Sequence, residues 1–265
     1  MTVRISEICE AINEIAPESI AESWDNSGLQ IAMTDKPVET VYVCLEITSE
    51  TVEEAASKKA EMIISHHPLI FKPIRTIDDR TATGKYILDL IESGISVYSA
   101  HTSFDSAWGG NNDDLARRIG LINIRALDDG LHKESGGLGR RGEYAPPRTL
   151  GQIVEIIKES LQIDRPVGIV GDPEAMIGTV AVSAGSGADI IDDISLQGCE
   201  LLVTGDTKFR HGQKAAASGI ALIDAGHFHT EKIFVENMSR LLSEKFNNRL
   251  RIIESSVDRD PFIMI

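Results

Sequence analysis

The sequence predicts an α/β protein whose sheets are mostly parallel or mixed and are flanked by helices. Short runs of β-branched residues alternate with helical stretches along most of the chain, and this alternation is typical of the class. A hydrophobic content of 42% and a charged content of 25% are ordinary for a folded protein. The length of 265 residues suits one large unit or two domains of ordinary size.

The predicted elements of the first half follow one another closely. Residues 40–48 (TVYVCLEIT) form a strand, and residues 49–60 form a helix with Ser49 as its N-cap. The next elements are a strand at 61–65, a helix at 84–94, a strand at 95–100 and a helix at 111–121. This last helix has an asparagine cap, early acidic residues and late arginines, which the helix dipole favours.

Residues 125–150 interrupt the alternation, because they are rich in glycine, proline and charge and carry little periodicity. We interpret them as a boundary or a crossing into a second lobe. Regular alternation then returns. The predicted elements are helices at 150–161, 189–198, 207–219 and 230–246, and strands at 166–170, 178–185, 200–205, 220–226 and 249–256.

Charge and cysteine content limit the classes of function. The net charge of −15, from 26 basic and 41 acidic residues, argues against non-specific nucleic-acid binding, which depends on clustered Lys and Arg. The three cysteines, Cys9, Cys44 and Cys199, are scattered, so we expect reduced core thiols. No apolar run is long enough for a membrane span, and the N-terminus lacks a signal-peptide core. We therefore predict a cytoplasmic protein without membrane association.

Histidines gather where predicted strands end. Five of the seven fall directly after a strand: His66, His67, His101, His227 and His229. Carboxylates accompany two of these groups, Asp105 in SAHTSFD and Glu231 in GHFHTE. In α/β sheets functional groups gather beyond the carboxyl ends of strands, so three strand ends are predicted to aim His and Asp or Glu toward one side of the molecule.

The dipeptide His66–His67 carries a geometric prediction. Neighbouring side chains of an extended chain point to opposite faces, and Pro68 favours an extended conformation at His67. The two imidazoles would then bind two ions, one on either side of the strand tip, more easily than one shared ion.

The spacing within the other two clusters sets further conditions. In a straight strand His101 and Asp105 would lie about 13 Å apart, so both join one site only if TSFD bends. His227 and Glu231 are four residues apart and share a face if a helix begins near them.

Imidazoles and carboxylates together suit Zn, Mn, Fe, Ni or Co, and the absence of cysteine from these clusters argues against a thiolate zinc site. Two divalent ions held by such a set would keep open positions for water or a bridging hydroxide, the usual nucleophile of two-metal hydrolases. The plainer alternative is that the histidines only cap strand ends or lie in the core, with Thr230 as a helix cap. Elemental analysis with and without chelator decides between the two. His132, in the glycine-rich boundary, is expected to be solvated.

Three further motifs leave alternatives open. TGDTKFRHGQK holds a basic cluster in which Lys208 and Arg210 can bind phosphate and His211 can transfer a proton, unless the cluster is only a solvated helix face. SAGSGAD, at residues 183–189, is either a phosphate-binding turn or a tight turn, and it lacks the Walker lysine. ESWDNSGLQI, at residues 22–31, predicts nothing alone.

These motifs together resemble the GTP cyclohydrolase 1 type 2 homologue family, also called the Nif-three-like dinuclear metal-centre proteins. WDNSGLQI, IISHHPLIF, SAHTSFDSAWGGNNDDLA, VSAGSGAD, ELLVTGDTKFRHGQKA and DAGHFHTE occur in the family's order over nearly the whole chain. The resemblance implies a short form of a two-lobed α/β fold, with residues 1–125 plus 228–265 in one lobe and 126–227 in the other. It also implies a homohexamer.

The resemblance also implies site residues. His66, His67, Asp105, His227 and Glu231 match the ligands of two metal ions, with Glu231 as the bridging carboxylate. His101 and His211 match recurrent histidines near the site. The implied function is a hydrolase acting on GTP or another phosphorylated small molecule through a metal-bound hydroxide. The alternative is a metal-binding scaffold, chaperone or regulator without turnover.

Overall fold

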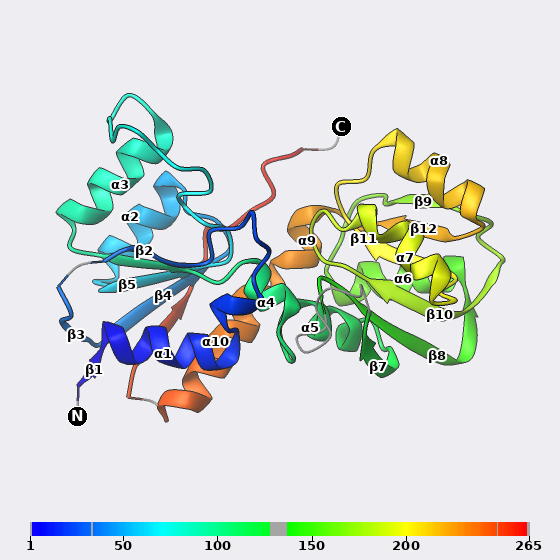
Figure 1. Ribbon diagram of the computed structural model, residues 1–265, viewed down its shortest axis with the longest axis horizontal. Helices are drawn as coiled ribbons and strands as arrows, with labels where there is room; N and C mark the ends of the chain where they lie inside the picture. Colours follow the sequence, from blue (N-terminus) through cyan, green and yellow to red (C-terminus); the bar gives the residue numbers. More distant parts are fainter. Residues whose placement is uncertain (1, 33, 128–136, 248, 264–265) are drawn as a thin grey trace. The chain divides into compact units, whose positions relative to one another are not determined.

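The computed structural model describes residues 2–32, 34–127, 137–247 and 249–263. The chain folds as two compact units, and each contains one mixed sheet covered by helices (Figure 1). Unit 1 comprises Met1–Phe104 and Phe234–Arg259, and unit 2 comprises Asp105–Ile233 and Asp260–Ile265. The predicted α/β class with mixed sheets is confirmed, whereas the domain division at residues 125 and 228 stays a prediction.

Unit 1 is built on a five-stranded sheet with the order β13-β4-β5-β6-β2. The first four strands of this order run parallel, and β2 pairs antiparallel with β6. The strands are β2 (Gly28–Ile31), β4 (Thr40–Cys44), β5 (Met62–Ser65), β6 (Ser96–Ser99) and β13 (Arg251–Glu254). A small antiparallel ribbon joins β1 (Val3–Arg4) to β3 (Pro37–Val38).

Apolar helix faces cover this sheet. The helices are α1 (Ile5–Ile15), the 3-10 turn η1 (Glu18–Ile20), α2 (Ser49–Ser57), α3 (Ala82–Glu92) and most of α10 (Ile233–Phe246). One core cluster packs β4, β5 and β6 side chains such as Tyr42, Ile63 and Val97 against α2 and α3. The N-cap of α2 is Thr48 and not Ser49. The Thr48 hydroxyl accepts from the Thr51 N–H at 3.3 Å, and the Thr51 hydroxyl accepts from the Thr48 N–H at 2.7 Å.

Unit 2 is built on a six-stranded sheet with the order β7-β8-β10-β11-β12-β9. Strands β10, β11 and β12 run parallel at its centre, and the three remaining strands pair antiparallel. The strands are β7 (Ile122–Ala126), β8 (Arg140–Thr149), β9 (Gly168–Val170), β10 (Met176–Val182), β11 (Leu201–Thr204) and β12 (Ala221–Asp224).

The helices of unit 2 supply the rest of its core. They are α5 (Asn111–Arg118), α6 (Leu150–Ser160), the 3-10 turn η2 (Ala188–Ile190), α7 (Ile191–Leu196), α8 (Phe209–Ser218) and α9 (His227–Glu231), while α4 (Thr102–Ser106) crosses the division between the units. Two clusters of buried, mainly aliphatic residues form, one under α5 and α6 and one under α7 and α8.

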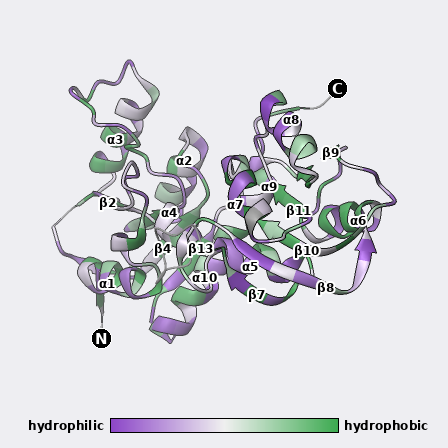
Figure 2. Cartoon of the chain, turned by 45° about the vertical axis from the view of Figure 1, so that its right-hand side comes forward, coloured by the Kyte–Doolittle hydropathy of each residue, from purple (hydrophilic) through white to green (hydrophobic). Residues whose placement is uncertain are grey.

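Five strands are not predicted from the sequence: β1, β2 and β3, which precede residue 40, and β7 and β8. Residues 125–150 hold the end of β7 and all of β8, which pair with each other and, through β8, with β10. Strand β8 reads RRGEYAPPRT and is largely hydrophilic, in contrast to the apolar β11 (Figure 2). Its exposed side chains hide the apolar alternation on which strand prediction depends. His132, expected to be solvated, lies outside the described residues.

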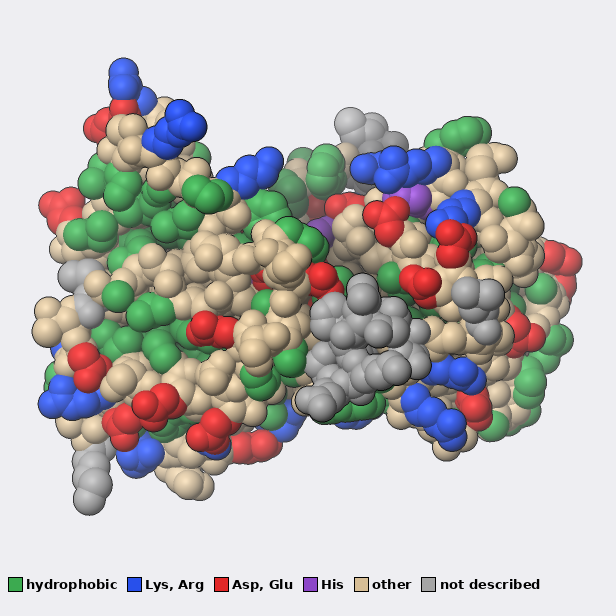
Figure 3. Space-filling model, viewed as in Figure 1, with side chains coloured by type: hydrophobic (Ala, Val, Ile, Leu, Met, Phe, Trp, Pro, Cys, Tyr) green, Lys and Arg blue, Asp and Glu red, His purple; other side chains and the backbone are tan. Residues whose placement is uncertain are grey.

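Surface composition bears on the predicted partners. On the face shown in Figure 3, acidic and basic side chains are interspersed. Within the described ranges, no helix combines the length and apolar character needed to cross a membrane.

Candidate metal-binding residues

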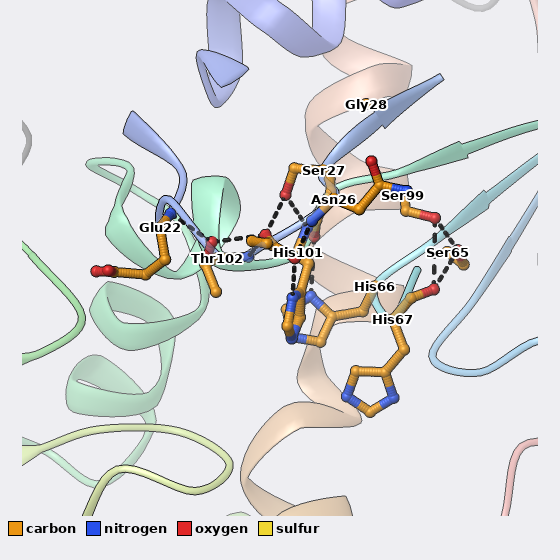
Figure 4. Close-up of polar contacts among 12 residues, drawn as sticks. Glu22, Asn26, Ser27, Gly28, Ser65, His66, His67, Ser99, His101 and Thr102 are labelled. Carbon is orange, nitrogen blue, oxygen red and sulfur yellow. Dashed lines mark hydrogen bonds and ion pairs between the residues drawn. The ribbon is translucent and has the colours of Figure 1, made fainter. Parts of the chain in front are cut away.

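Three histidines of unit 1 come together at one edge of its sheet. His66 and His67 follow β5, and His101 follows the neighbouring parallel strand β6, where Ser65 is paired with Ser99. The ring centroids lie 5.2 Å apart for His66–His67 and for His66–His101, and 5.6 Å apart for His67–His101 (Figure 4). One ring nitrogen from each lies within 4.8 Å of the others, a spacing that can hold a metal ion.

The prediction that His66 and His67 point to opposite faces is wrong. Strand β5 ends at Ser65, and the chain bends at both histidines instead of staying extended. The alternation of a strand therefore no longer applies, and the two rings lie at an interplanar angle of 39°. His66 is buried, and the side chain of His67 is 20% exposed.

The three rings use Nδ1 in the same way. His66 Nδ1 lies 2.9 Å from the Ala100 carbonyl, His67 Nδ1 lies 2.8 Å from Glu46 Oε2, and His101 Nδ1 lies 2.7 Å from Asp25 Oδ1. Carbonyls and ionised carboxylates only accept, so each Nδ1 donates and each neutral ring keeps its lone pair on Nε2. Metal-binding histidines show the same arrangement, in which an acceptor on one nitrogen orients the other toward the ion.

Asp25 is the most firmly held of these acceptors. Its side chain is fully buried. Besides His101, its carboxylate accepts from the Thr102 hydroxyl at 2.6 Å, the Ser27 hydroxyl at 2.7 Å and the Thr102 N–H at 3.1 Å. Burial alone would raise the pKa of Asp25, but the hydrogen bonds that its carboxylate accepts from His101 and from the two hydroxyls hold that pKa well below its usual value. Asp25 is therefore ionised and fixes the orientation of His101.

His227 and Glu231 of unit 2 lie on one face of helix α9, as the four-residue spacing predicted. His227 Nε2 lies 2.7 Å from Glu231 Oε2, and its Nδ1 lies 2.8 Å from Asp206 Oδ2. His227 thus shares the acceptor on Nδ1 with the histidines of unit 1, whereas its Nε2 lies against a second carboxylate, that of Glu231.

Asp105 and Glu231 form a close pair of acids in unit 2. A carboxylate oxygen of each lies within 4.8 Å of the other, and the residues are 6% and 3% exposed. Two buried carboxylates at this distance repel each other, so a cation between them would stabilise both. Asn111, expected to cap α5, donates its amide to Asp105 Oδ1 at 3.2 Å instead, and Gly110 holds the cap position.

The SAGSGAD turn makes room for Glu231. Gly185 has a φ of +64°, and a Cβ added there would lie 2.0 Å from Glu231 Oε1. The Gly185 N–H donates to the Thr230 hydroxyl at 3.0 Å, and its carbonyl accepts from the Gly205 N–H at 2.8 Å. A glycine is needed here both for the left-handed backbone and for the close approach of the carboxylate.

Helix α4 supplies the bend that the HTSFD prediction required, because the Phe104 N–H bonds to the His101 carbonyl at 2.9 Å. The structure thus groups His66, His67 and His101 within unit 1, and Asp105, His227 and Glu231 within unit 2. That both sets serve one metal centre stays a prediction from the sequence.

The basic cluster lies at the start of helix α8. His211 is buried, and its Nδ1 accepts from the Lys208 N–H at 3.1 Å, which caps the helix. Lys208 and Arg210 are exposed, and an Arg210 guanidinium nitrogen lies 3.8 Å from Asp189 Oδ1. The capping bond gives His211 a structural role, and the predicted roles in proton transfer and phosphate binding stay predictions.

Comparison with known proteins agrees with the resemblance drawn from the motifs. The family model described as Duf34/NIF3 (NGG1p interacting factor 3) matches residues 3–261. The chain belongs to the DUF34/NIF3 family. A protein of Clostridium perfringens named GTP cyclohydrolase 1 type 2 homolog is 32% identical over 263 residues, which cover 99% of this chain and 100% of that protein.

Other relatives of this DUF34/NIF3 chain support the same assignment. A Clostridium acetobutylicum protein of the same name is 34% identical over 267 residues, with 99% of each chain covered. The crystal structure of a Bacillus cereus protein related to NIF3 has a TM-score of 0.92 and 25% identity, with both chains fully covered. The predicted family membership is confirmed.

Sequence reasoning missed the acceptors behind the histidines. Glu46 follows β4 and Asp206 follows β11, so extending the strand-end argument from histidines to carboxylates would have found both. Asp25 gives no such signal, because it lies in the irregular segment before β2, 76 residues from His101 in the chain.

Proposed function

We propose that this DUF34/NIF3 protein is a hydrolase with a dinuclear metal centre that acts on GTP or another phosphorylated small molecule. The observation that carries the proposal is the shared arrangement of four histidines. His66, His67, His101 and His227 each have an acceptor within 2.9 Å of Nδ1. In metal sites an acceptor on one ring nitrogen orients the other nitrogen toward the ion, and all four histidines have such an acceptor on Nδ1. Histidines that only cap strand ends would not need this orientation.

Five residues would hold the two ions: His66, His67, Asp105, His227 and Glu231. Their nitrogen and oxygen ligands suit Zn, Mn, Fe, Ni or Co. The buried acids of unit 2 would be stabilised by a cation, and Glu231 is the proposed bridging ligand, since it lies close to both Asp105 and His227. When bound, such ions act as Lewis acids and lower the pKa of coordinated water.

The remaining roles belong to the chain's own side chains. His101, oriented by Asp25, is proposed to move a proton at Nε2, and His211 is the second candidate for proton transfer. Lys208 and Arg210 are proposed to bind the substrate phosphates. The nucleotide is suggested by the name GTP cyclohydrolase 1 type 2 that relatives carry.

Metal analysis and turnover test this function together. We expect two equivalents of divalent metal per chain, lost on chelation, and metal-dependent conversion of GTP or hydrolysis of a phosphoester. His67→Ala and Asp105→Ala should abolish turnover and lower the metal content while the circular dichroism spectrum stays unchanged. His229→Asn is the matched control, because His229 shares α9 with His227 but contacts Arg165 and Asp260.

Other outcomes would contradict the proposal in distinct ways. Full metal loading without turnover across a broad metabolite panel would favour the non-catalytic scaffold, chaperone or regulator. Absence of metal in protein purified without chelator would leave the histidines as capping residues only. The predicted homohexamer and cytoplasmic location are part of the same proposal, and light scattering after size exclusion tests the former.

A further inference from the structure

The WDNSG segment has a use beyond holding His101. Asp25 and Ser27 point inward to His101 and Thr102, whereas Trp24 between Ser23 and Asp25 is 56% exposed. A tryptophan side chain left in water forgoes a large burial energy, so its exposure at the end of a buried polar network requires a reason.

A second exposed aromatic residue lies beside it. Phe71, four residues after His67, is 45% exposed. The Trp24 and Phe71 rings have centroids 6.0 Å apart at an interplanar angle of 61°. Both also contact the His101 ring, at 6.1 Å for Trp24 and 6.3 Å for Phe71, in edge-to-face geometry. The three rings form one aromatic cluster that begins at a candidate catalytic histidine and ends in solvent.

Hydrogen bonds clamp the two aromatic segments together. The Asn26 amide donates to the Ile70 carbonyl at 2.6 Å, and the Ile70 N–H donates to Gln30 Oε1 at 3.2 Å. Asn26 and Gln30 are also hydrogen-bonded to each other. Figure 4 shows Asn26 of this clamp near His101. Phe71 follows the clamped Ile70 directly, and Trp24 lies two residues before the clamped Asn26. The positions of both rings are therefore set before any ligand binds, which lowers the entropic cost of binding.

The other tryptophan shows what distinguishes this cluster. Trp108 is also 56% exposed, but the Arg140 guanidinium lies over its ring at 4.7 Å. Trp24, in contrast, meets the rings of Phe71 and His101 in edge-to-face geometry. Exposed residues Lys72 and Arg75 follow Phe71 closely in the chain and supply positive charge in the same segment.

We propose that Trp24 and Phe71 bind the planar heterocycle of the substrate, so that it lies next to His101. This inference rests on the proposed function and narrows its substrate class to nucleotides or other phosphorylated molecules with an aromatic ring. Sugar phosphates carry no aromatic ring and would lack this contact with Trp24 and Phe71. Base–aromatic contacts of this kind change affinity by roughly fivefold to a hundredfold per base.

Tryptophan fluorescence gives a direct test, because the chain has only two tryptophans. In the Trp108→Phe variant all tryptophan emission comes from Trp24. We expect GMP to quench this emission in a saturable way and ribose 5-phosphate to leave it unchanged. In the reciprocal Trp24→Phe variant, GMP should leave the emission of Trp108 unchanged.

Two further variants, Trp24→Ala and Phe71→Ala, quantify the contact by calorimetry. Each should weaken GMP binding by about fivefold or more, with unchanged affinity for ribose 5-phosphate. Their metal content should equal that of the wild type, since neither side chain is a ligand. Equal binding of GMP and ribose 5-phosphate, or unaltered GMP affinity in both variants, would overturn the inference. The inference would also be overturned if the emission of Trp24 changed with protein concentration and not with GMP, since the cluster would then be an interface between copies of the chain.

The same titration in chelator-treated protein separates the two proposals. Quenching of Trp24 by GMP in protein that never shows turnover would leave the aromatic site standing while the hydrolase proposal fails. Metal-dependent hydrolysis of phosphoesters with no preference for substrates that carry an aromatic ring would support the hydrolase proposal and contradict the aromatic site.

Discussion

At the scale of single residues, the candidate site depends on which ring nitrogen of each histidine carries the proton. The pairing of His101 with Asp25 matters most, because the carboxylate is buried and accepts from four further donors, the Asn26 N–H among them. A carboxylate in that place leaves His101 one neutral tautomer, with the proton on Nδ1.

Replacing this carboxylate by an amide should reverse the tautomer. In Asp25→Asn the amide oxygen is expected to face the Ser27 and Thr102 donors, which puts the NH₂ group against His101 Nδ1 and forces the ring proton onto Nε2. The ¹⁵N chemical shifts of His101 in metal-free protein report this directly. Because His101 is proposed to move a proton at Nε2, we also expect turnover to fall by roughly a hundredfold or more.

Asp35→Asn is the control for this substitution, since Asp35 is an acceptor for Ser6 at the start of α1 and does not contact a histidine. A spectrum in which His101 keeps its Nδ1 proton in Asp25→Asn would show that Asp25 does not set the tautomer.

At the scale of elements, strand ends and the turns after them carry the candidate site. Parallel strands β5 and β6 bring His66 and His101 to one edge of the sheet of unit 1. In unit 2 the turn after β10 shapes the space for Glu231 of α9. The strands and turns themselves have common geometries, and it is their order in the sheet that brings the candidate ligands together.

The Gly185 turn offers a test of this role. Gly185→Ala places an alanine in the left-handed conformation, which destabilises the fold by about 1–2 kcal/mol. The added methyl group also clashes with the Glu231 carboxylate. Gly198→Ala is a matched control, because Gly198 has a φ of +71° and no heavy atom within 4 Å of an added Cβ. We expect a similar loss in unfolding free energy from backbone strain in both, and loss of metal affinity in Gly185→Ala alone.

Isothermal titration with zinc and urea denaturation measure the two effects separately. Equal metal affinity in the two glycine variants would mean that the position of Glu231 does not depend on Gly185.

At the scale of the whole molecule, the chain returns to its first sheet after building the second. Strand β13 pairs with β4, so unit 1 is closed by residues from both ends of the described chain. Asp258 secures this return, since its carboxylate accepts from the Leu45 N–H at 2.8 Å.

The same contact predicts how stability responds to pH. Burial raises the pKa of Asp258 above 3.8, against the hydrogen bonds of Leu45, Glu46 and Ser255. The folded chain then holds this proton more tightly than the unfolded chain, so the contribution of Asp258 to stability falls as pH rises from about 4 through the folded-state pKa. Asp258→Asn lacks this loss, and its stability relative to the wild type should increase with pH.

Urea denaturation of both proteins between pH 3 and 7 provides the measurement. A difference in unfolding free energy that stays constant, or that shrinks with rising pH, would contradict the sign of the shift. Asparagine can still accept from the Leu45 N–H, so the comparison isolates the charge.

The sequence by itself determined the α/β class, most helices and buried strands, and the candidate ligands at strand ends, because apolar periodicity and strand-end position are properties of short segments. Tertiary structure alone decided that His66 and His67 bend toward each other, that polar β8 joins a sheet, and that Asp25 meets a histidine 76 residues away. The reason is physical: local pattern selects an element, but the partner of a buried polar group is chosen only when distant elements pack and each donor must find an acceptor.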